Sequence, residues 1–175
     1  MRFIETPLTG AWLIEIDPIQ DTRGFFARTY CEDQFSAYGL ETHWPQCSIS
    51  YNRRRGTLRG LHYQIPPHEE TKLVRCTQGA VFDVIVDLRP DSVTHRQWFS
   101  TILSQDNRHM LYVPAGFAHG FQTLVDESEV YYQISQRYVP EASAGIRWND
   151  PALGIKWPLS DPILSDRDRA YPDLK

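Results

Sequence analysis

The segment Leu58–Gln64 concentrates polar side chains and glycine in a stretch that otherwise has strand character. Its His62 can take up and release protons near neutral pH, because an imidazole has an unperturbed pKa of ~6.5. A lone histidine on a strand is more often a surface or hydrogen-bonded core residue, so both interpretations stand at this point. Arg59 is a candidate anion-binding residue. Strict alternation puts Arg59 and His62 on opposite faces, and a bulge near Gly60 is needed if both serve one site.

A second histidine, His119, follows a turn and starts a predicted strand. The pattern in residues 113–121 resembles the second sequence motif of cupins, in many of which this histidine binds a metal ion. A metal-binding cupin usually also carries a His-x-His pair, whereas residues 62–64 read His-Tyr-Gln. Two histidines are too few for a three-histidine site, so we expect no bound metal.

Three further side chains have both a structural and a chemical interpretation. Alternation in residues 130–135 groups Tyr132 with apolar neighbours, so its hydroxyl is expected to point inward. It is then either a core tyrosine bonded to a backbone carbonyl or a proton donor. Lys72 at a strand start and Asp168 in a turn are equally compatible with plain solvation. Individually, none of the three decides the chemistry.

The elements that must position these residues are short. The 12 prolines and 10 glycines are scattered and divide the chain into brief segments, which is typical of an all-β domain. We expect a peripheral helix in residues 31–38 closed by Gly39, and irregular chain wrapping the barrel in residues 148–172. Strands without helices between them predict an antiparallel sandwich or barrel. The expected strands are residues 12–16, 73–77, 80–88, 99–103, 111–113, 120–125 and 130–135.

Residues 80–88 show the clearest alternation in the chain. One face carries only apolar side chains, and the other combines Val81 and Ile85 with the carboxylates Asp83 and Asp87. We expect the apolar face to pack in the core.

The bulk properties limit the class of protein. A length of 175 residues suits one domain covering residues 1–175, and a formal net charge of −4 argues against a nucleic-acid-binding surface. The three cysteines, Cys31, Cys47 and Cys76, have no CxxC spacing, which argues against disulfides or a zinc site. No signal-peptide core is present, and no apolar run approaches the ~20 residues of a membrane span. We therefore expect a soluble cytoplasmic protein.

Six ordered blocks together resemble the dTDP-4-dehydrorhamnose 3,5-epimerase family. The blocks are residues 21–26 (DxRGFF), 58–64 (LRGLHYQ), 72–76 (KLVRC), 83–89 (DVxVDLR), 114–121 (PxGFAHGF) and 148–151 (WNDP). The resemblance spans nearly the whole chain and implies an all-β antiparallel jelly-roll (cupin) barrel with short peripheral helices. It also implies a homodimer that works on a nucleotide-linked sugar without a metal or organic cofactor, in making dTDP-L-rhamnose.

The resemblance assigns catalytic roles to four residues. His62 corresponds to the general base, Asp168 to its orienting carboxylate, Tyr132 to the proton donor, and Lys72 to the lysine near the sugar ketone. These residue types suit the chemistry, because protons beside the C4 ketone are acidic and their loss leaves an enolate that needs a positive charge at O4. Inversion requires a base and an acid on opposite sides of the sugar ring.

Substrate-binding roles are assigned in the same way. Arg23 and Arg59 correspond to the arginines that meet the pyrophosphate, His119 to a histidine near the substrate, and Tyr138 to a tyrosine of the nucleotide side. Gln46, which begins the string that reads Gln-Asp-Asn in the family, is also a candidate substrate-binding residue. The chain departs from the family pattern at four positions: Arg28 for Glu, Ser48 for the Asn of that string, Ser143 for Glu, and Gln133 for Lys.

The predicted function is epimerisation of a nucleotide-linked 4-keto-6-deoxyhexose at C3, C5 or both. Arg28, Ser48 and Ser143 lie at positions associated with nucleotide contact, so the nucleotide and the sugar stay open. The alternatives are a noncatalytic sugar-nucleotide binding module on the same barrel and a metal-dependent cupin enzyme.

Overall fold

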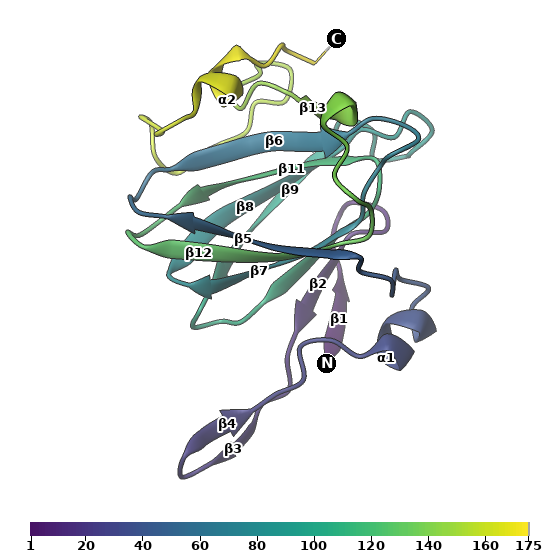
Figure 1. Cartoon of the computed structure of the whole chain (residues 1–175), viewed down its shortest axis with the longest axis vertical. Helices are drawn as coiled ribbons and strands as arrows, with labels where there is room; N and C mark the ends of the chain where they lie inside the picture. The colour runs from purple at the N-terminus through teal and green to yellow at the C-terminus, as the bar shows by residue number, and fades with distance from the viewer. Residues whose placement is uncertain (175) are drawn as a thin grey trace.

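The computed structural model describes residues 1–174, which form two facing antiparallel sheets and a separate two-stranded hairpin (Figure 1). The six-stranded sheet has the order β1-β2-β10-β7-β12-β5, the five-stranded sheet the order β13-β6-β11-β8-β9, and the hairpin is β3-β4. The strand bounds are β1 Arg2–Glu5, β2 Trp12–Glu15, β3 Ile19–Asp21, β4 Gly24–Phe26, β5 Gln46–Asn52, β6 Leu58–Gln64, β7 Lys72–Gln78, β8 Ala80–Asp87, β9 Trp98–Ser104, β10 Met110–Val113, β11 Phe117–Thr123, β12 Ser128–Ile134 and β13 Ser143–Gly145.

The strand pairing has the nested order of a jelly roll. Strands β8 and β9 form the innermost pair, followed outward by β7 with β10, β6 with β11, and β5 with β12, all antiparallel. Successive pairs alternate between the two sheets, so the doubled chain wraps around itself. The predicted fold class is confirmed. Within residues 1–174 the two sheets share no ladder, so the jelly roll is an open sandwich and not a closed barrel.

Strand β8 is buried on both faces, which refines the expectation for this segment. Val81 and Ile85 belong to the core between the sheets, on the same face as Asp83 and Asp87, which are 0% exposed. The purely apolar face packs instead beneath the C-terminal segment, against residues such as Ile146 and Leu153. The two carboxylates therefore point into the inter-sheet space.

The expected elements are present, with several additions. The predicted helix is α1, Glu32–Ala37, and Gly39 after it has φ +67°. Strand β11 starts at Phe117, three residues before the expected start. The prediction of purely irregular chain in residues 148–172 was wrong, because a second short helix, α2, spans Asp166–Ala170. A 3₁₀ turn, η1, spans Pro140–Ala142.

The strands absent from the prediction are β1, β3, β4, β5 and β13. Strand β5 has inward side chains that are all polar, namely Gln46, Ser48, Ser50 and Asn52, so apolar alternation does not reveal it. Its inward face borders a cavity and not a dry core. None of the helices in residues 1–174 has the length and apolar character that crossing a membrane requires.

Candidate active site

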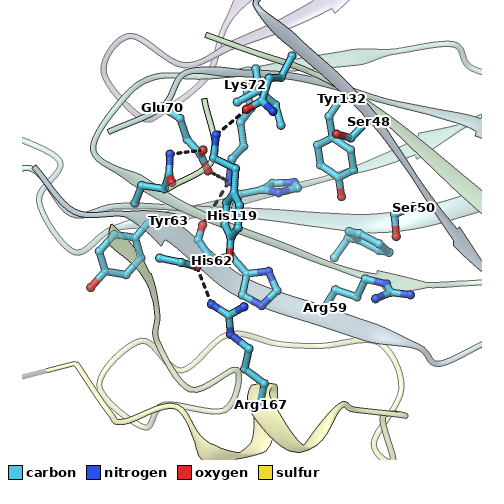
Figure 2. A pocket seen from close by; sticks show the side chains of 16 residues that line it. Ser48, Ser50, Arg59, His62, Tyr63, Glu70, Lys72, His119, Tyr132 and Arg167 are labelled. Atoms are coloured by element: carbon cyan, nitrogen blue, oxygen red, sulfur yellow. Dashed lines mark hydrogen bonds and ion pairs between the residues drawn. The ribbon is translucent and has the colours of Figure 1, made fainter. Parts of the chain in front are cut away.

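A cavity of about 360 Å³ opens between the two sheets (Figure 2). The six-stranded sheet contributes side chains from β5, β7 and β12, and the five-stranded sheet contributes side chains from β6, β11 and β13. The lining residues are Gln46, Ser48, Ser50, Arg59, His62, Tyr63, Gln64, Glu70, Lys72, His119, Phe121, Tyr132, Ile134, Tyr138, Ser143 and Arg167. Nine of the twelve predicted site residues are in this set, and Asp168 lies directly behind it, bonded to His62.

The predicted irregularity near Gly60 brings Arg59 and His62 to the same cavity. The β6–β11 register shifts between the residues that pair with Arg59 and His62, and Gly60 has φ +139°. A Cβ atom at Gly60 would lie 2.6 Å from the Cα atom of Gly120. Only glycine fits this close crossing of two strands, where the register shift lets Arg59 and His62 line the same cavity.

His62 and Asp168 form a hydrogen-bonded pair at the five-stranded wall. The His62 Nε2 atom lies 2.5 Å from Asp168 Oδ1, and the Asp168 side chain is 6% exposed. Asp168 stands in α2, where its backbone N–H donates to the side chain of the N-cap residue Ser165. Burial acts to raise the pKa of Asp168, but the hydrogen bond and charge of His62 outweigh it, and the pKa lies below its usual value. When the Asp168 carboxylate accepts a hydrogen bond from Nε2–H, the lone pair of neutral His62 is on Nδ1.

Tyr132 faces the cavity from the opposite sheet, and its hydroxyl points inward (Figure 2). Burial, reinforced by the negative charge of Asp83, raises the pKa of Tyr132 well above the usual tyrosine value, although Arg59 opposes this. The phenol therefore stays protonated at neutral pH. The Tyr132 and His119 rings meet edge to face, with centroids 5.8 Å apart.

Lys72 is held by a carboxylate that sequence reasoning missed. Its Nζ atom lies 2.9 Å from Glu70 Oε1 and 3.4 Å from the backbone oxygen of His62. Gln64 donates from Nε2 to the other Glu70 oxygen at 2.9 Å and accepts from the backbone N–H of Val139 through Oε1. Glu70 lies two residues before Lys72, on the same side of an extended chain, and that spacing was a usable signal.

His119 has a carboxylate partner as well. Its Nε2 atom lies 2.9 and 3.0 Å from the two oxygens of Asp83, and His119 is only 4% exposed. Burial raises the pKa of Asp83, and the nearby His119 and Lys72 oppose this shift. A buried carboxylate in an apolar strand was the sequence signal for this pair. Within residues 1–174, no three or more His, Cys, Asp and Glu side chains gather in a group that could hold a metal ion.

The mouth of the cavity is polar and carries an arginine absent from the predicted set. Arg167, from α2, donates from Nη2 to Ser143 Oγ at 2.5 Å. Hydrogen bonds from Ser143 and Arg167 hold the pKa of Tyr138 below its usual value. Gln46 accepts from the backbone N–H of Tyr138 at 2.5 Å. The mouth therefore offers guanidinium, phenol, amide and hydroxyl groups to a ligand.

Two predicted substrate-binding residues do not line this cavity. Arg23 lies at the tip of the β3–β4 hairpin, which extends away from the sheets (Figure 1), and it pairs with Asp21 at 2.5 Å. Its side chain is 88% exposed. Arg28 lies just after this hairpin, beside Met1 and Asp17. Within one chain, the structure does not bring either arginine to the cavity.

Comparison with known proteins agrees with this geometry. Residues 5–175 match the sequence model of the family described as dTDP-4-dehydrorhamnose 3,5-epimerase. A protein of that description from Methanothermobacter thermautotrophicus is 45% identical, with 99% of this chain and 95% of the relative aligned. One from Pseudomonas aeruginosa is 47% identical over 97% of this chain and 93% of the relative. The chain belongs to this family. It is therefore an isomerase of the epimerase class.

Solved structures support the same assignment. The dTDP-4-dehydrorhamnose 3,5-epimerase from Bacillus anthracis, with TDP and PPi bound, superimposes with a TM-score of 0.96 at 46% identity and covers 99% of both chains. An epimerase from Legionella pneumophila in complex with dTDP-4-keto-L-rhamnose has a TM-score of 0.92 at 36% identity, with 98% and 92% coverage. A 3′-monoepimerase from Streptomyces bikiniensis in complex with dTDP-quinovose has a TM-score of 0.90 at 32% identity, with 97% and 86% coverage.

Proposed function

We propose that this epimerase inverts C3 and C5 of dTDP-4-keto-6-deoxyglucose, giving dTDP-4-keto-L-rhamnose. The observation that carries the proposal is the arrangement of proton-transferring groups on opposite walls. The His62–Asp168 pair stands on the five-stranded side of the cavity, and the Tyr132 hydroxyl points in from the six-stranded side (Figure 2). A base and an acid on facing walls are what inversion of a carbon centre needs.

In the proposed reaction, the C4 ketone acidifies the proton on each neighbouring carbon, and His62 removes it through Nδ1. Asp168 fixes the tautomer of His62 and stabilises the imidazolium that forms. The electron pair moves onto O4, where Lys72 stabilises the enolate by its charge. Tyr132 then delivers a proton to the other face of the same carbon, and the ketone reforms. Before the second inversion the imidazolium of His62, whose side chain is 40% exposed, releases its proton to solvent, and the Tyr132 phenolate takes one up from solvent. The second carbon then reacts in the same way, and no external oxidant or reductant is needed.

The cavity mouth suits the nucleotide diphosphate. Arg59 and Arg167 supply the positive charge, and Tyr138 offers a ring for stacking on a base. Gln46, Ser48 and Ser143 offer neutral hydrogen-bonding groups. The Bacillus anthracis relative with TDP and PPi bound supports a dTDP-linked substrate.

We propose further that this single-domain protein acts in the cytoplasm as a homodimer in which the β3–β4 hairpin of each chain reaches the partner's cavity. The exposed fractions of Ile19 and Phe26 on this hairpin are 73% and 72%, which is unusual for large apolar side chains and supports burial against another chain. Arg23 and Arg28 would then meet the substrate from the partner. The three free cysteines, one of them exposed, suit a reducing compartment.

Mixing two inactive variants tests the exchanged hairpin. In a mixed dimer, Arg23→Ala of one chain and His62→Asn of the other both fall in the same cavity, so the second cavity stays intact, and subunit exchange should restore up to about a quarter of the wild-type activity. A mixture that stays inactive although mixed dimers form would refute the exchange. A monomer by light scattering would refute the dimer.

The decisive test of the activity is incubation with dTDP-4-keto-6-deoxyglucose in D₂O, followed by mass and NMR analysis of the sugar. Deuterium at both C3 and C5 with inverted product is the expected result. Deuterium at one carbon only would restrict the reaction to a monoepimerisation. Absence of exchange with this substrate and with its GDP, CDP and UDP counterparts would leave a binding function in place of catalysis.

A further inference from the structure

Asn52 connects the two sheets at the edge of the cavity through a side-chain amide that is hydrogen-bonded at both Nδ2 and Oδ1. It ends β5 of the six-stranded sheet and is 2% exposed. Its Nδ2 group donates to the backbone oxygens of Ser50 and Ser128, at 3.0 and 3.1 Å. Its Oδ1 atom accepts from Nε of Arg59, across the cavity edge on β6, at 2.7 Å. The amide cannot be turned over, because its NH₂ group would then face the arginine donor.

This contact selects which edge of the Arg59 guanidinium is available to a ligand. A guanidinium can grip an anion side-on, through Nε and one Nη, or end-on, through both Nη groups. Asn52 occupies Nε, so the side-on edge is taken. Nη1 and Nη2 make no hydrogen bond to any group of residues 1–174. The end-on fork is therefore the edge that stays free beside the cavity.

We propose that Asn52 is a positioning residue that holds Arg59 in one orientation, with its two terminal nitrogens ready to bind a diphosphate oxygen end-on. The inference rests on the proposed nucleotide-sugar site and adds a residue to it that touches no substrate. Because Asn52 is anchored to two backbone carbonyls and buried, it orders the flexible Arg59 side chain before the ligand arrives. Ordering before binding lowers the entropy cost of capturing the anion.

Calorimetric titration of the full-length protein with dTDP, inorganic pyrophosphate and thymidine tests the proposal. Asn52→Ala should weaken the affinity for dTDP and for pyrophosphate by about 2- to 12-fold, which is the cost of ordering one long side chain on binding. Thymidine, which has no phosphate, should bind as before. KM should rise by a similar factor while kcat at saturating substrate stays unchanged. In an Arg59→Lys background there is no guanidinium for Asn52 to orient, so Asn52→Ala should cause no further loss of affinity.

Ser128→Ala is the matched control. Ser128 pairs with Asn52 in the sheet and is equally buried, but its hydroxyl bonds to the backbone oxygens of Val125 and Ala80 and not to Arg59. It should lower stability without changing pyrophosphate affinity. If Asn52→Ala does not fold, Asn52→Ser replaces it, since the shorter hydroxyl can bond a backbone carbonyl but cannot reach Arg59.

Three outcomes would overturn the role of Asn52. They are an unchanged affinity of Asn52→Ala for pyrophosphate, an equal loss of affinity for thymidine, and the same loss of pyrophosphate affinity when Asn52→Ala is made in the Arg59→Lys background. A wild-type protein that binds pyrophosphate but not dTDP would contradict the proposed nucleotide instead, and the pyrophosphate titrations would still decide the positioning role. The failures of the two proposals are therefore distinguishable.

Discussion

Replacing Tyr132 with Phe should separate proton removal from inversion. In the proposed mechanism His62 alone removes the proton, and it can also return one to the same face, which exchanges hydrogen with solvent but leaves the configuration unchanged. Only protonation from the opposite wall inverts the centre. Tyr132→Phe deletes that donor and keeps the ring that packs against the inter-sheet core.

The size of the effect follows from the environment of each group. A positioned general acid contributes about 100- to 10,000-fold to a rate, so formation of inverted product should fall by that factor. The His62 side chain is 40% exposed, so its proton can exchange with D₂O before it returns to the sugar. Deuterium incorporation should therefore fall by less than about tenfold. The Tyr132 hydroxyl has no hydrogen-bond partner within residues 1–174, so stability should change by less than about 1 kcal/mol.

The assay compares initial rates of deuterium incorporation and of product formation in D₂O, for the wild type and for Tyr132→Phe. Thermal unfolding checks that the variant is folded. Equal loss of both rates would assign Tyr132 to enolate formation or to substrate binding. Unchanged rates would return it to the role of a core tyrosine.

Further predictions address the base, metal independence and pH. His62→Asn should abolish hydrogen exchange with solvent at both carbons, and normal exchange in this variant would mean that the base is another group. Asp168→Asn should lower the exchange rate by about 10- to 150-fold, which corresponds to the loss of one charge-assisted hydrogen bond. Activity should survive exhaustive EDTA treatment, because within residues 1–174 no metal-binding group forms, and a loss restored by one divalent metal would contradict this. Asp87→Asn should lower the free energy of unfolding by about 2–4 kcal/mol at pH 7, because it breaks the ion pair between the buried Asp87 carboxylate and the half-buried Arg89 guanidinium. Burial acts to raise the pKa of Asp87, but Arg89, Ser92 and Thr94 hold it far below the usual value. Its contribution is therefore full above about pH 4 and should shrink as the pH falls in an unfolding series; a difference between wild type and variant that does not depend on pH would refute the linkage.

Much of the site could be predicted from chemistry and motif resemblance, but some of its members could not. Each of Glu70, Asp83 and Arg167 is an ordinary charged residue in the sequence. They become site residues through contacts with Lys72, His119 and Ser143. The Asp83–His119 pair joins neighbouring strands and the Arg167–Ser143 pair joins distant segments, so local patterning does not show that these side chains meet. For Glu70 and Lys72 the two-residue spacing was a usable signal, but only the fold shows that the pair lines the cavity. Arg23 shows the converse, since its motif was clear but its own chain leaves it outside the cavity.

The sequence by itself determined the all-β class, most of the strands in the two sheets, and the residue types needed for proton transfer. Periodicity, turn residues and motif spacing are local properties, and they suffice for these conclusions. Only the tertiary structure decided that His62 and Tyr132 stand on facing walls, that α2 brings Asp168 to His62, and that Asn52 restrains Arg59. The physical reason is that nested strand pairing joins distant segments across two sheets, and the wall each side chain faces depends on that pairing and on the irregularity at Gly60.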